Sequence, residues 1–221
     1  MAQPAQPARP YDSTRRRAAA ERTRLAIVEA TKRAFEERGW SGASVRLIAE
    51  DAGVSPKTVE AQFGTKAALL QAAVDFAIRG DLDATPMPER EAVRRMEEAP
   101  SAATMLALHA AHLRRIHERS ARIARAVEQA AADQPAAAEL WEAMNRNRAF
   151  GVGWAARTLM TKPGLRRGLT PEEIETAMWV ALDWATYHTL TMHAGLDGDG
   201  YETWLRRYYR AMFLQRRRRD G

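Results

Sequence analysis

Residues 44–63 read SVRLIAEDAGVSPKTVEAQF, and the spacing within this stretch predicts two short helices joined by a tight turn. Ser44 and Ser55 each stand just before a helical segment, where a side-chain oxygen can accept a free backbone N–H. Gly53 lies between the segments and can adopt the left-handed conformation that turns the chain. The stretch therefore predicts a helix-turn-helix whose second helix can enter a DNA major groove.

The exposed positions of the second helix and the starts of the helices supply the expected DNA contacts. Backbone N–H groups and the helix dipole favour phosphate near the N-terminus of that helix. A glutamine can read an adenine edge and a carboxylate can accept from a cytosine amino group, whereas basic and hydroxyl side chains grip the backbone. The residues that we expect to contact DNA are Ser44, Arg46, Ser55, Lys57, Thr58, Glu60, Gln62 and Lys66.

Apolar residues recur at helical spacing along most of the chain, and no segment shows the period-two alternation of a strand. We therefore expect an all-α fold, with Thr170 and Asp199 capping the last two helices. The expected helices span residues 14–38, 45–52, 56–62, 66–80, 89–98, 101–130, 136–162, 171–194 and 200–216. The expected parts are a disordered arm (1–13), a helix-turn-helix DNA-binding domain (14–65), a helical body (66–216) and a basic tail (217–221).

The net charge of +6 is unevenly distributed along the 221 residues. Residues 1–66 hold 12 Lys and Arg against 8 Asp and Glu, residues 67–205 hold 15 against 19, and residues 206–221 hold 7 against 1. A polyanion should therefore meet the ends of the chain and not its middle. Directly after the arm, the arginines at 15–17 either reach a minor groove or form a solvated face.

The composition also bounds the class of protein. Cysteine is absent, which excludes disulfides, thiolate metal sites and thiol catalysis. No signal peptide and no run of about 18 apolar residues is found, so we expect a soluble, cytoplasmic protein. His109 and His112 are close enough in sequence to share a metal, but no clear partner accompanies them, and we expect neither metal nor cofactor.

No Gly-rich phosphate loop, nucleophile elbow or HExxH motif is present, so we do not expect an enzyme. Two alternatives remain open. One is an enzyme whose pocket carries no recognisable motif. The other is a helical adaptor that uses the helix-turn-helix only as a packing corner.

The block around the helix-turn-helix resembles the DNA-binding head of TetR-family transcriptional regulators. Across residues 20–72 it contains a helix ending at Gly39, a Ser-capped helix, a GVS turn, a short helix ending at Phe63 and the sequence GTKAALL. Glu60 stands where members often carry tyrosine, and Val45 where some carry threonine. The resemblance implies a ligand-responsive, sequence-specific regulator of transcription, most simply a repressor that leaves a pseudo-palindromic operator when it binds a small molecule.

The resemblance also implies a helical body with a ligand pocket in its core and a homodimer formed through the last two long helices. The stripe interrupted by Asn147 and Gly151 can line a pocket for a mostly apolar inducer that tilts helix 66–80, although a kinked helix explains it equally well. The expected ligand-binding residues are Met105, Leu108, Trp141, Met144, Asn147, Gly151 and Trp154. The expected dimer residues, which can also be intramolecular core, are Ile174, Met178, Leu182, Ala185, Trp204, Leu205, Tyr208 and Met212.

Overall fold

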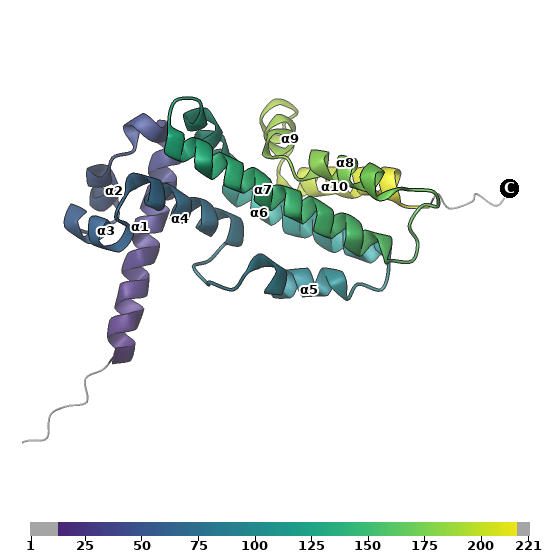
Figure 1. Cartoon of the computed structure of the whole chain (residues 1–221), viewed down its shortest axis with the longest axis horizontal. Helices are drawn as coiled ribbons and strands as arrows, with labels where there is room; N and C mark the ends of the chain where they lie inside the picture. Colours follow the sequence, from purple (N-terminus) through teal and green to yellow (C-terminus); the bar gives the residue numbers. More distant parts are fainter. Residues whose placement is uncertain (1–12, 216–221) are drawn as a thin grey trace, which may run out of the picture.

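The computed structural model describes residues 13–215, which form an all-α fold (Figure 1). Its helices are α1 (Ser13–Gly42), α2 (Val45–Asp51), α3 (Pro56–Phe63), α4 (Lys66–Arg79), α5 (Glu91–Glu97), α6 (Ala102–Ala131), α7 (Pro135–Met160), α8 (Pro171–Ala181), α9 (Trp184–His188) and α10 (Gly198–Phe213). A 3-10 turn (Met87–Glu89) precedes α5, and a π-helical turn (Thr189–His193) follows α9. The basic tail and, apart from Ser13, the N-terminal arm lie outside the described residues.

The helix-turn-helix forms where the spacing predicts it. The Ser44 hydroxyl accepts the Leu47 N–H at 3.2 Å and begins α2, and Gly53, with φ of +67°, turns the chain toward α3. The preceding helix is interrupted at Gly39, whose φ is +62°, so the predicted end of the regular helix is confirmed. Local signals therefore suffice to define this corner.

Helices α6 and α7 pack lengthwise and form the long axis of the molecule, and α1–α4 gather at one end of that pair (Figure 1). A buried cluster that includes Phe35, Ile48 and Val59 continues into Ile123 and Val127 of α6. The helix-turn-helix thus shares an apolar core with the body instead of hanging from a linker. Between residues 13 and 215, no helix is both long and apolar enough to cross a bilayer.

The C-terminal helices differ from the prediction. The single helix expected over 171–194 is broken after α8, because Asp183 caps a new helix by accepting the Ala185 N–H at 3.1 Å. The break lets the Trp184 ring turn inward and donate its N–H to the Ser120 hydroxyl at 2.9 Å.

The helix caps near the C-terminus were predicted with mixed success. Thr170 caps α8 with a complete capping box, as predicted. The expected cap at Asp199 is wrong, since Asp197 accepts the Gly200 N–H at 2.7 Å and begins α10 earlier. Asp199 instead pairs with Arg114 of α6. A tertiary partner thus engages the carboxylate that the local pattern assigned to capping.

Candidate nucleic-acid interface and internal cavity

Helix α3 presents a polar face while its apolar side is held in the corner. Val59 is fully buried, and Lys57, Glu60 and Ala61 are exposed. Gln62 and Thr58 are half-buried, so their side chains lie at the edge of the exposed face. The helix can therefore offer short and long polar groups to a groove without losing its packing.

The start of α3 is held by a reciprocal pair of hydroxyl groups. The Ser55 hydroxyl accepts the Thr58 N–H at 3.1 Å and lies 2.8 Å from the Thr58 hydroxyl. These bonds orient both side chains at the positive end of the helix dipole. At the start of α2, Ser44 and Arg46 are exposed, so both remain accessible to a backbone phosphate.

Lys66 occupies a different position from the expected one. Its ammonium group donates to the Trp40 carbonyl and lies 4.9 Å from the centre of the Trp40 ring and 5.7 Å from that of Phe35. Desolvation lowers the pKa of this amine. Lys66 therefore ties the start of α4 to the end of α1, and a contact between its half-buried side chain and DNA stays a prediction.

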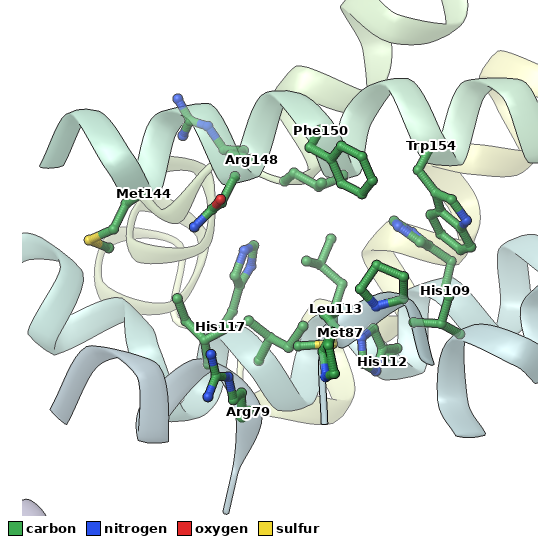
Figure 2. A pocket seen from close by; sticks show the side chains of 18 of the residues that line it. Arg79, Met87, His109, His112, Leu113, His117, Met144, Arg148, Phe150 and Trp154 are labelled. Atoms are coloured by element: carbon green, nitrogen blue, oxygen red, sulfur yellow. The ribbon is translucent and has the colours of Figure 1, made fainter. Parts of the chain in front are cut away.

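An internal cavity of about 410 Å³ lies between α6 and α7 and is closed on one side by α4 and the turn before α5. Figure 2 shows Met144, Phe150 and Trp154 of α7 on one wall and His109 and His117 of α6 on the other. The volume is within the range of small-molecule sites.

The cavity includes four of the residues expected to bind ligand: Met144, Asn147, Gly151 and Trp154. The other three lie outside this cavity, so their contact with a ligand stays a prediction. Met105 is fully buried in the body core, Leu108 packs against that core, and Trp141 packs against the cluster shared with the head.

Two buried histidines on the cavity wall were not among the expected ligand contacts. His109 Nδ1 lies 2.8 Å from the Tyr209 hydroxyl, and His117 Nδ1 lies 2.8 Å from the Tyr201 hydroxyl. Burial lowers the pKa of each imidazole to about 3, so both rings are neutral near pH 7. Their spacing of two helical turns on one face of α6 is the sequence signal that could have placed them together.

Three of the expected dimer residues belong to the interior of the subunit. Ile174, Met178 and Leu205 are fully buried by the other helices of the same chain, so the intramolecular alternative holds for these three residues. The expected residues that keep some exposed surface are Leu182, Ala185, Trp204, Tyr208 and Met212. The periodicity alone could not separate the inward face of an amphipathic helix from an outward apolar one.

Two large side chains that the prediction missed lie exposed on α8. Trp179 is 37% exposed and Val180 is 45% exposed. On α10, the rings of Trp204 and Tyr208 stack with centroids 5.3 Å apart and are half-buried. An outward apolar surface therefore exists on both of these helices. On α10 it includes the expected Trp204 and Tyr208, and on α8 it includes Trp179 and Val180, which the prediction missed.

The sequence profile of the bacterial regulatory proteins of the tetR family matches residues 27–73, the segment that contains α2 and α3. A search of curated protein sequences finds no significant match. Solved structures match over most of the chain at low identity, so they establish the fold alone.

One of these structures is described as a TetR-family transcriptional regulator from Rhodococcus sp. (19% identity, 86% of this chain, 98% of that chain, TM-score 0.61). Another is NalD of Pseudomonas aeruginosa, the secondary repressor of the MexAB-OprM multidrug efflux pump (19% identity, 91% of this chain, 100% of that chain, TM-score 0.65). A third is described as a transcriptional regulator from Saccharomonospora viridis in complex with choline (18% identity, 87% of this chain, 98% of that chain, TM-score 0.63).

The profile match covers the helix-turn-helix, and the structural matches cover the body as well. With its capped second helix in place, the segment 27–73 carries the profile of the bacterial regulatory proteins of the tetR family, and the chain has the fold of these solved regulators.

Proposed function

We propose that this protein is a repressor that binds a specific pseudo-palindromic operator as a homodimer in the cytoplasm and leaves it when a small molecule fills the cavity. The observation that carries the proposal is the exposed face of α3 on a corner held by Val59 and the Ser55 cap. Lys57 and Thr58 at the start of the helix are suited to phosphate, and Glu60 and Gln62 are suited to base edges.

The contacts of α4 support a ligand response. Only two residues separate this helix from the end of α3, and its Asp75, Ile78 and Arg79 line the cavity. At its other end, the Arg119 guanidinium of α6 donates to the carbonyls of Ala77 and Ile78, each at 3.0 Å. A ligand that displaces Ile78 or Arg79 would therefore move a helix that is connected directly to the recognition helix.

A dimer is supported by the apolar surface left on α8 and α10, where Trp179, Val180 and Trp204 retain exposure. One head offers few base contacts, whereas two related by a two-fold axis would read half-sites roughly 34 Å apart. The repressor role follows the description of the P. aeruginosa neighbour, and the ligand response is in keeping with the choline complex of the S. viridis neighbour.

The test begins with selection of bound duplexes from a random pool, followed by gel shifts at two salt concentrations. Lys57→Ala should weaken binding to the selected duplex roughly 5- to 10-fold at low salt and reduce the slope of log K against log salt by about 0.9, because one phosphate contact is lost. Lys162→Ala at the far end of α7 removes the same charge and should change neither quantity. If no duplex is bound at low ionic strength, or if both variants weaken binding equally, the proposal is wrong.

A further inference from the structure

The cavity continues into a second, more open hollow, whose composition differs sharply from that of the cavity. The two share Arg79, Met87 and His112, so they form one connected space. The hollow has a volume of about 450 Å³ and is bordered by five arginines, Arg79, Arg90, Arg94, Arg115 and Arg119. We call it the arginine hollow.

The cavity wall beside this hollow offers a hydrogen-bond donor. The Tyr209 hydroxyl is buried, and its one partner among the described residues is His109 Nδ1 at 2.8 Å. A neutral tyrosine must give its proton to an acceptor, and His109 supplies one only if Nδ1 is unprotonated. His109 Nε2 then carries the proton, and no described residue accepts from it. The His109 ring therefore presents its Nε2–H group to the cavity as a donor, and a hydrogen-bond acceptor on the ligand would satisfy it.

The charges around the arginine hollow are only partly balanced. Arg90 pairs with Asp81 at 2.8 Å and Arg94 with Glu91 at 3.2 Å. Arg79 and Arg115 have no ion-pair partner among residues 15–215.

The remaining groups leave the hollow basic. Arg119 is positively charged although its donors are engaged by α4 carbonyls. Asp83 and Glu89 also border the hollow, and the Asp83 carboxylate already accepts from Thr85. His112 lies between the two spaces, and burial followed by repulsion from Arg115, Arg119 and Arg90 lowers its pKa to about 4. This repulsion agrees with an excess of positive charge around the hollow.

We propose that the ligand of this cavity is an amphipathic monoanion, with an apolar body between α6 and α7 and a carboxylate that lies beside His109 and His112 and faces the arginine hollow. This inference rests on the proposed function, since it names the chemical class of the inducer. The aromatic and methionine side chains of the cavity suit the apolar body, and the donors and unpaired guanidinium groups suit the anion. A cationic amphiphile of the same size would meet the arginines and be repelled.

The experiment is isothermal titration calorimetry of the purified full chain with three probes of equal chain length: decanoate, decan-1-ol and decylammonium. Decanoate should bind at least about 10-fold tighter than decylammonium, with decan-1-ol between them, and its advantage should shrink as salt is raised. Arg115→Gln should weaken decanoate about 3- to 10-fold and leave decan-1-ol unchanged. Arg122→Gln, also exposed and two turns further along α6, is the matched control and should affect neither probe.

A second variant tests where the apolar body lies. Gly151→Leu adds bulk to the cavity wall, where even a Cβ would lie 3.5 Å from Leu182, and it should weaken decanoate and decan-1-ol alike. Preferred binding of decylammonium, equal effects of Arg115→Gln and Arg122→Gln, unchanged binding in Gly151→Leu, or no binding of any probe would each overturn the inference. Because these titrations contain no DNA, they fail or succeed independently of the gel shifts that test the operator proposal.

Discussion

The corner of α2 and α3 and the layer of α6 and α10 are stabilised in different ways. In the corner, the helix caps join residues three positions apart, such as Ser55 and Thr58, and the longer polar contact is an exposed ion pair between Asp51 of α2 and Arg33 of α1. In the layer, His109 bonds Tyr209, and His117 bonds Tyr201, across 100 and 84 residues. All five histidines of the chain lie between residues 109 and 193, so the body alone contains buried imidazoles. The comparison teaches that the corner is defined by local caps and a turn glycine, whereas the layer depends on buried polar pairs between residues far apart in the sequence.

The largest expected difference between the two regions is in their response to acid. His109 and His117 have folded-state pKa values of about 3, below the usual 6.5. Between these values the unfolded chain binds more protons than the folded chain, so stability is full above pH 6.5 and falls as the pH is lowered. Lowering the pH from 7.5 to 5 should therefore reduce the free energy of unfolding by up to about 2 kcal/mol for each of these imidazoles.

Urea unfolding at fixed protein concentration measures this loss, and hydrogen exchange assigns it to regions. Protection should fall first in α6 and α10 and later in α2 and α3. His109→Gln should reduce the number of protons taken up on unfolding near pH 5 by about one, and so flatten the pH dependence of the free energy of unfolding. His193→Gln, at an exposed position, is the control and should not flatten it. A pH dependence that is the same in wild type and His109→Gln would contradict the expected role of the buried ring.

The next comparison is between a substitution in the interior of the body and one on its outer surface. Leu205→Ala should lower the free energy of unfolding by about 2–5 kcal/mol, since the side chain is fully buried within one subunit. Val180→Arg, at a position that is 45% exposed on α8, should change the free energy of unfolding of the dissociated monomer by less than about 0.5 kcal/mol. The same change should raise the dimer dissociation constant at least about 10-fold, as sedimentation equilibrium would show. Unaltered self-association in Val180→Arg would remove α8 from the dimer surface.

The smallest effect compares a glycine of the corner with one of the cavity wall. At Gly53 a Cβ would meet nothing within 4 Å, but the φ of +67° disfavours any side chain, so Gly53→Ala should cost about 1–2 kcal/mol. At Gly151, inside α7, a Cβ would make an ordinary contact with Leu182, and Gly151→Ala should stabilise the protein by about 0.4–1 kcal/mol. Thermal unfolding of both variants measures whether each substitution lowers or raises the stability. If both change the stability in the same direction, backbone conformation is not what distinguishes the two glycines.

The success of the sequence prediction follows the same division. Ser44, Gly53 and Ser55 identified the helix-turn-helix because each acts on backbone groups within three residues. The long helix expected over 171–194 failed because the inward turn of Trp184 toward Ser120 is a contact across 64 residues. The inward position of Lys66 was missed for a similar reason, since its partner Trp40 lies 26 residues earlier. Part of the cavity wall was found, through Asn147 and Gly151, because a polar and a small residue interrupt an apolar stripe.

The amino-acid sequence by itself determined the helical class, the corner of α2 and α3 and the exposed residues of the recognition helix, because caps, turns and periodicity act over one or two helical turns. Only the tertiary structure decided which apolar faces are interior, that the histidines of α6 are buried against tyrosines of α10, and that Lys66 turns inward. Those outcomes depend on which helices meet and at what register, and no short-range pattern encodes that choice.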